Sequence, residues 1–127
     1  MGKCRVLLVE DFEPTRELYR LCLTSSGYEV LEAPTGTEAI AVATAERPDI
    51  ILMDIGLPDI DGWQATAALK SDARTVGIPI IAITAHALRD ERERSKHVGC
   101  DGFMTKPCLP EALIAEIERV IADPARQ

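Results

Sequence analysis

Short runs of apolar residues recur along the chain at regular intervals, and most of them end at a polar side chain. Their aliphatic and β-branched residues follow one another without polar alternation, which is typical of strands buried on both faces of a parallel sheet. Successive runs start about 21 to 29 residues apart, the length of one strand and one helix. We expect these strands to begin near Arg5, Glu29, Ile50, Pro79 and Gly102.

The intervals between the runs carry apolar residues at helical spacing. Prolines and glycines mark several of the expected helix ends. The first helix is expected after Pro14, where Leu18, Leu21 and Cys22 repeat at i, i+3 and i+4, with a stop at Gly27. The second is expected after Thr37, with Ala39, Ile40 and Ala43 and an end at Arg47-Pro48. The others are expected from Trp63 to Leu69, over residues 88–98, and from Pro110, with Leu113, Ile117, Val120 and Ile121 inward.

The alternation of strands and helices predicts the fold class. Right-handed crossovers and five strands favour an α/β, doubly wound, five-stranded parallel sheet of order 2-1-3-4-5, flavodoxin-like, with five helices on its two faces. We found no internal linker or repeat, so residues 1–127 are expected to form a single domain. The fourth helix carries apolar residues only at its two ends. It can be a solvated helix laced with ion pairs, a weakly anchored element that moves in switching, or both.

Composition narrows the class of protein. A chain of 127 residues with 46% hydrophobic residues is globular, and no apolar run reaches the ~18 residues that a membrane span needs. Residues 1–5 lead directly into the first strand without the apolar segment of a signal peptide, so we expect a cytoplasmic protein without membrane contact. The net charge of −7 disfavours nucleic-acid binding. The 4 cysteines lack zinc-site spacing and are expected to be free thiols.

Acidic residues stand where two of the predicted strands end. Glu10 and Asp11 follow the first strand, and Asp54 ends the third. In the order 2-1-3-4-5 these strands are neighbours, so the three carboxylates meet at the carboxyl edge, where open α/β sheets place ligands. Two such charges ~4 Å apart repel by about 4 kcal/mol at an effective dielectric constant near 20. Oxygen ligands of this kind suit Mg²⁺, with Mn²⁺ as a substitute.

The same edge predicts phosphoryl chemistry. Asp54 is the expected nucleophile, while Thr84 and Lys106, at the ends of the last two strands, are expected to donate hydrogen bonds to phosphoryl oxygens. Lys106 would also neutralise Asp54 before reaction. Each residue has an ordinary structural interpretation: a strand-end Asp can cap a helix, a Thr can be a capping hydroxyl, and a Lys can be a surface residue. Their joint placement on adjacent strands favours the phosphoryl site.

At these residues the chain resembles the receiver domains of two-component response regulators, the CheY-like superfamily, over essentially its whole length. Each matching segment is weak alone, but their order and spacing are specific. The segments are residues 9–11 (VED), 51–62 (ILMDIGLPDIDG), 82–85 (AITA) and 99–107 (GCDGFMTKP). The resemblance implies that Asp54 accepts a phosphoryl group from a phosphohistidine of a histidine kinase or histidine phosphotransfer protein. It also implies Mg²⁺ held by Asp11, Asp54 and the backbone carbonyl of Gly56, with Glu10 acting through water.

The resemblance further implies a switch rather than an enzyme. Thr84 moves toward the phosphoryl group, the ring of Phe103 turns inward, and the face of the fourth helix, fifth strand and fifth helix changes to control a downstream protein target. A core role for Phe103 is the alternative. The Lys106-Pro107 bond is expected to be cis. His86 is expected near the approach of water to the phosphoryl group, where it would orient water, shield the site or be an ordinary loop residue.

Other proteins with related chemistry fit less well. A haloacid dehalogenase-type phosphatase needs an acid two residues after its nucleophile, and Gly56 stands there. A flavodoxin needs a Ser/Thr/Gly-rich phosphate loop where Glu10-Asp11 would repel phosphate, and a Gly-x-Gly-x-x-Gly motif for dinucleotides is absent from the sequence. An unphosphorylated interaction module of the same fold and a receiver module of a hybrid histidine kinase stay open as alternatives.

Overall fold

The computed structural model describes residues 4–85 and 89–123. Its centre is a sheet of five parallel strands in the order β2-β1-β3-β4-β5, and this confirms the predicted order. The strands are β1 (Arg5–Val9), β2 (Glu29–Ala33), β3 (Ile50–Asp54), β4 (Ile80–Thr84) and β5 (Gly102–Thr105). The crossover from β1 to β2 and then back past β1 to β3 makes the two acid-ended strands direct neighbours, with Val9 opposite Met53.

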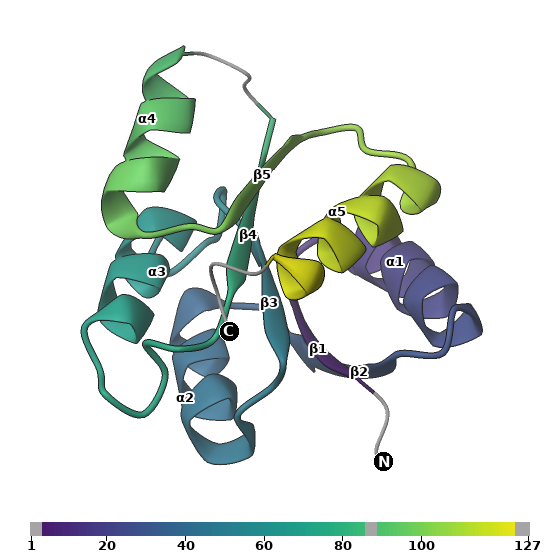
Figure 1. Ribbon diagram of the computed structural model, residues 1–127, viewed down its shortest axis with the longest axis horizontal. Coiled ribbons are helices and arrows are strands. Elements are labelled where there is room, and N and C mark those ends of the chain that lie inside the picture. Colours follow the sequence, from purple (N-terminus) through teal and green to yellow (C-terminus); the bar gives the residue numbers. More distant parts are fainter. Residues whose placement is uncertain (1–3, 86–88, 124–127) are drawn as a thin grey trace.

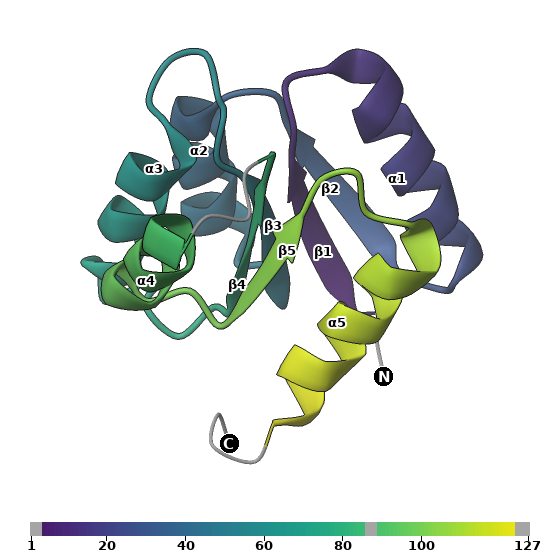
Figure 2. The ribbon, with the colours of Figure 1, turned by 90° about the horizontal axis from the view of Figure 1, so that it is seen from above.

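Helices cover both faces of the sheet, as Figures 1 and 2 show. The helices α1 (Glu13–Ser25) and α5 (Pro110–Ala122) lie on one face. On the other face lie α2 (Gly36–Glu46), α3 (Gly62–Lys70) and α4 (Arg89–Val98). Each face encloses a separate apolar cluster, one built around Leu7, Met53 and Trp63 and the other around Leu8, Leu52 and Ile117. The two clusters bury alternate residues of the same strands, which fixes the register of the sheet.

Local sequence signals explain where several helices begin and end. The side chain of Thr35 caps α2 by accepting a hydrogen bond from the amide of Glu38 at 3.1 Å. Asp61 and Gln64 form a reciprocal capping box at the start of α3. A proline stands in the first turn of α1 and of α5, where its missing N–H costs no helical hydrogen bond. Gly27 follows α1 at φ 97°, a conformation that glycine adopts without strain.

The inward face of α1 differs from the one that the sequence predicts. Leu18 and Leu21 are both 51% exposed, whereas Tyr19 and Leu23 are the buried residues of this helix. Tyr19 and Leu23 also have helical spacing. The helix itself is therefore present as predicted, but its buried face is not the one that Leu18 and Leu21 indicate. In α5 the expected residues Leu113, Ile117 and Val120 are buried, but Ile121 is 38% exposed because it lies at the edge of that stripe.

The length and hydropathy of the helices bear on whether any of them could span a membrane. Within residues 4–85 and 89–123, none of them combines the length and the apolar character needed to cross a bilayer.

The start of α3 packs closely against the strand that carries Asp54, and Gly62 lies at this contact. A Cβ at Gly62 would lie 2.6 Å from both the carbonyl oxygen of Asp54 and the Cα of Ile55, which are backbone atoms. Gly62→Ala should therefore lower the free energy of unfolding by about 1–3 kcal/mol, measured by urea denaturation. Gly77→Ala is the control, because a Cβ there meets no atom within 4 Å. Equal stability of the two variants would contradict this packing.

Candidate functional site

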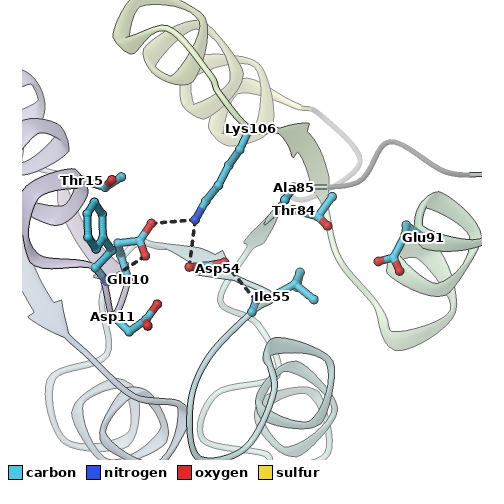
Figure 3. Close-up of a pocket in the computed structure, with 11 residues that line it drawn as sticks. Glu10, Asp11, Thr15, Asp54, Ile55, Thr84, Ala85, Glu91 and Lys106 are labelled. Atoms are coloured by element: carbon cyan, nitrogen blue, oxygen red, sulfur yellow. Dashed lines mark hydrogen bonds and ion pairs between the residues drawn. The ribbon is translucent and has the colours of Figure 1, made fainter.

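A pocket of about 430 Å³ opens at the carboxyl edge of the sheet (Figure 3). The ends of β1, β3, β4 and β5 supply most of its lining, because parallel strands present their carboxyl ends on one side. The polar residues that line it are Glu10, Asp11, Thr15, Asp54, Thr84, Glu91 and Lys106. Among these described residues, carboxylates predominate and Lys106 is the one cation.

Three carboxylates lie together in this pocket. One oxygen from each of Glu10, Asp11 and Asp54 falls within 4.8 Å of the others. Glu10 and Asp54 are buried, and Asp11 is exposed at the mouth of the pocket. The cause is the apolar run before each acid: those residues fill the core and leave the next side chain at the strand end. The three acids lie close together because β1 and β3 are neighbours in the sheet and end at the same edge.

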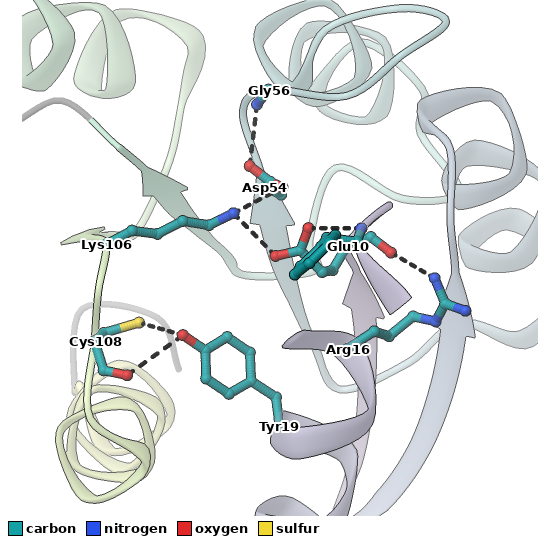
Figure 4. Close-up of polar contacts among 8 residues, drawn as sticks. Glu10, Arg16, Tyr19, Asp54, Gly56, Lys106 and Cys108 are labelled. Atoms are coloured by element: carbon teal, nitrogen blue, oxygen red, sulfur yellow. Dashed lines mark hydrogen bonds and ion pairs between the residues drawn. The ribbon is translucent and has the colours of Figure 1, made fainter. Parts of the chain in front are cut away.

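The ammonium of Lys106 bridges the two buried acids. Its Nζ lies 2.9 Å from Glu10 Oε1 and 3.0 Å from Asp54 Oδ2 (Figures 3 and 4). The side chains of Glu10 and Asp54 are only 3% and 7% exposed, so these are short charge pairs shielded from bulk water. The backbone amide of Lys106 donates to the carbonyl of Thr84 at 2.7 Å, which extends the pairing of β4 and β5 up to this lysine. One cation thus compensates two buried anions in part.

Burial and neighbouring charges shift the proton affinities of this group. The pKa of Glu10 is raised from 4.5 to about 7, first by burial and then by the Asp54 carboxylate, whereas Lys106 opposes the rise. Burial by itself would lower the pKa of Lys106, but its hydrogen bonds to Glu10 and Asp54 outweigh that effect and raise the pKa above 10.5. The lysine therefore stays charged at neutral pH. Glu10 binds its proton more tightly than an exposed glutamate does, because it is buried beside a second carboxylate.

Backbone amides and one arginine hold the acids in position. The amide of Phe12 donates to Glu10 Oε2 at 3.1 Å, and the amide of Gly56 donates to Asp54 Oδ1 at 3.0 Å. Arg16, on α1, donates from Nη1 to the backbone carbonyl of Glu10 at 2.9 Å (Figure 4). Both oxygens of Asp54 thus accept a hydrogen bond, which orients the carboxylate toward the pocket.

The remaining expected residues lie around this centre. Thr84 lines the pocket at the end of β4 and is 4% exposed. Phe103, on β5, is half-buried against the core, and the guanidinium carbon of Arg92 lies 4.9 Å from the centre of its ring. The Lys106-Pro107 peptide bond is cis. His86 lies outside the described residues.

Some residues of the site were not foreseen from the sequence. Thr15 lines the pocket and Arg16 holds Glu10 from the first turns of α1, and Glu91 lines the pocket from α4. Tyr19 donates its hydroxyl proton to the backbone carbonyl of Cys108 at 3.3 Å, which ties α1 to the segment after Lys106. A helical wheel phased on Tyr19 and Leu23 would have placed Arg16 on the inner side of α1. Nothing in the pattern of α4 distinguishes Glu91 from its other acids.

The three carboxylates fit a divalent cation. Mg²⁺ prefers oxygen ligands and commonly takes one or two carboxylates while keeping water or phosphate oxygens in its other positions. Glu10, Asp11 and Asp54 offer such oxygens within 4.8 Å of one another, and Asp11 is exposed to solvent. The donor set does not favour Zn²⁺, which proteins usually bind through cysteine or histidine, since no cysteine or histidine among the described residues joins this cluster.

Comparison with protein-family models matches residues 6–118 to the response regulator receiver domain. The chain therefore belongs to the receiver domain family of two-component response regulators.

Similar proteins include regulators and a sensor kinase domain. The polar-differentiation response regulator DivK of Brucella anthropi is 39% identical over 118 residues, covering 93% of this chain and 96% of DivK. The structure of the chemotaxis protein CheY4 of Vibrio cholerae is 31% identical with a TM-score of 0.89, covering 94% and 99% of the two chains. The receiver domain of the sensor histidine kinase PA1611 from Pseudomonas aeruginosa, solved with a magnesium ion in its active-site cleft, is 34% identical with a TM-score of 0.87, covering 97% and 100%.

The raised pKa of Glu10 predicts a pH dependence of stability in buffer without divalent cations. The folded protein holds this proton more tightly than the unfolded chain, so the free energy of unfolding should fall as the pH rises from 4.5 to about 7. The fall attributable to Glu10 should be about 1–3 kcal/mol. Urea denaturation at a series of pH values measures it.

Glu10→Gln should remove this part of the pH dependence, because the amide does not titrate in this range. Glu111→Gln, at an exposed position in the first turn of α5, is the control and should keep the wild-type profile. An unchanged slope between pH 4.5 and 7 in Glu10→Gln would show that Glu10 does not carry this proton.

Proposed function

We propose that this protein is a phosphorylation-dependent signalling switch. Asp54 accepts a phosphoryl group from the phosphohistidine of a histidine kinase or histidine phosphotransfer protein, with Mg²⁺ in the pocket. The observation that carries the proposal is the shared ammonium of Lys106, 2.9 Å from Glu10 and 3.0 Å from Asp54, inside an acidic pocket. A purely structural lysine would not require three carboxylates around the same cavity.

The residues of the pocket divide the work of phosphoryl transfer. A carboxylate oxygen of Asp54 attacks phosphorus, the phosphorus–nitrogen bond of the phosphohistidine breaks, and the imidazole leaves with the bonding electron pair. Lys106 donates to the oxygens of the arriving phosphoryl group, and the Thr84 hydroxyl, at the end of the next strand, is the second donor. The amide of Gly56 keeps Asp54 oriented during the approach. Positioning and charge compensation supply the catalysis here.

A divalent cation completes the charge balance of the pocket. Asp11 and Asp54, with the backbone carbonyl of Gly56, would hold Mg²⁺ directly, and Glu10 would act through water. When bound, Mg²⁺ offsets the negative charge that the phosphoryl group brings beside three carboxylates. Mn²⁺ is the expected substitute because it also prefers oxygen ligands. The open mouth at Asp11 gives the cation a route into the site.

The output of the switch is a change in the face formed by α4, β5 and α5. Thr84 is drawn toward the phosphoryl group, and Phe103 turns into the space that opens behind it. Support comes from the sheet register, in which Ala82, two residues before Thr84, pairs with Phe103. The changed face binds a downstream protein target, and neither nucleic acid nor a membrane is a partner of this chain. His86 stays a predicted modulator of hydrolysis.

The proposed role is the same in a response regulator and in the receiver domain of a histidine kinase. The relatives include named response regulators and the receiver domain of a sensor histidine kinase. In either setting the chain is a regulatory phosphoacceptor that promotes its own phosphotransfer and dephosphorylation, not an enzyme acting on a separate metabolite.

The phosphoacceptor is tested with acetyl phosphate and Mg²⁺ as the only reagents. The wild-type protein should gain one phosphoryl group by intact mass spectrometry, and chelation of Mg²⁺ should abolish the gain. Asp54→Asn should remain unmodified, because an amide oxygen is a far weaker nucleophile than a carboxylate.

Asp61→Asn is the matched control, because Asp61 caps α3 on the same connection and asparagine also caps helices well. It should be phosphorylated to the wild-type level. Labelling of Asp54→Asn at the wild-type rate would place the acceptor at another residue, and failure of the wild-type protein to become labelled would refute the proposed function.

A further inference from the structure

One acid of the pocket belongs neither to the sheet nor to the carboxylate cluster. Glu91 lies on α4, and its half-buried side chain lines the same cavity as Asp54 and Thr84 (Figure 3). Among the described residues, the charged side chains around the cavity are four carboxylates, Glu10, Asp11, Asp54 and Glu91, and one ammonium, Lys106. Lys106 pairs with Glu10 and Asp54. Among the side chains that the structure describes, Glu91 makes no ion pair that would offset its charge.

The helix that carries Glu91 is attached to the rest of the protein by few apolar contacts. Among the described side chains of α4, only Ser95 is buried, and Val98 is half-buried against the core. Two exposed arginines instead rest on aromatic rings, Arg92 at 4.9 Å from the ring centre of Phe103 and Arg94 at 5.4 Å from that of Trp63. Cation–π contacts at exposed positions are weak. Displacing α4 therefore breaks little of the hydrophobic core.

We propose that the carboxylate of Glu91 couples the occupancy of the phosphoryl pocket to the position of α4. A phosphoryl group on Asp54 adds negative charge to a cavity that Glu91 already faces, and the two repel each other. The cation and Lys106 act on the cluster at the strand ends, whereas Glu91 belongs to a helix that can move. The repulsion is relieved when the first turn of α4 moves away from the pocket, and the contact of Arg92 with Phe103 then weakens.

This coupling is reciprocal by thermodynamic linkage. If an anion in the pocket drives α4 outward through Glu91, then Glu91 in turn weakens the binding of that anion. Neutralising Glu91 must therefore change two properties together: the pocket binds the anion more tightly, and α4 responds less to it. A residue that merely lines the pocket or stabilises the helix would not produce this pair of changes.

The test uses beryllium fluoride with Mg²⁺ as a phosphoryl mimic on the full chain. Glu91→Gln removes the charge at nearly constant size, and Asp90→Asn is the control, since Asp90 is the exposed neighbour in the same first turn. Glu91→Gln should bind the mimic about threefold to tenfold more tightly than the wild type, with a difference that shrinks at high salt. Asp90→Asn should bind as the wild type does.

Hydrogen exchange of residues 90–98 gives the second readout. Loading should lower amide protection there in the wild type and in Asp90→Asn, and clearly less in Glu91→Gln. Equal affinity of Glu91→Gln and wild type, or an undiminished loss of protection in Glu91→Gln, would overturn the proposal. The inference rests on the proposed function, and the two fail differently: a wild-type protein that binds no mimic and accepts no phosphoryl group refutes the function, whereas normal binding with an unaffected Glu91→Gln refutes only the coupling.

Discussion

The shared hydrogen bonds of Lys106 are the interaction on which the rest of the site depends. Glu10 and Asp54 are nearly inaccessible to water, and their oxygens lie 2.9 Å and 3.0 Å from one ammonium. Breaking a buried ion pair by removing one partner commonly costs several kcal/mol, because the remaining charge is left without compensation. Here one cation serves two anions, with Asp11 close by, so the metal-free pocket keeps an excess of negative charge. The raised pKa of Glu10 reflects its burial first and the neighbouring Asp54 carboxylate second, and the three carboxylates together offer oxygen ligands that a divalent cation could take.

The fold produces this concentration of charge at little cost to the core. The strands β1 and β3 are buried over nearly their whole length and bring their polar ends to one edge, while Lys106 comes from the end of β5, on the far side of β4. Stability thus comes from the middle of the sheet and chemistry from its rim. The most polar helix, α4, lies beside that rim and buries only Ser95 among its described side chains. We therefore expect α4 to be an element that a change of charge in the pocket displaces at little cost to the core.

Most of the fold and the centre of the site could be predicted from the sequence because they depend on strands. Unbroken apolar runs identify buried parallel strands, and the residue after each run, such as Glu10 or Lys106, must then lie at the carboxyl edge. Positions on helices were harder to predict, since their direction depends on a helical phase that several apolar patterns satisfy. Leu18 and Leu21 fit such a pattern but face solvent, while Tyr19 and Leu23 face the core. Arg16 and Glu91 reach the site from helices, and only the packed structure reveals their direction.

The coupling between Lys106 and Asp54 is the most direct test of this view of the site. The free energy of unfolding is measured by urea denaturation, without divalent cations and above pH 7, for the wild type, Lys106→Met, Asp54→Asn and the double variant. We expect Lys106→Met to destabilise the wild type strongly and the Asp54→Asn background much less, with a coupling energy of at least about 1 kcal/mol. Equal losses in the two backgrounds would show that the ammonium does not hold the buried carboxylates together.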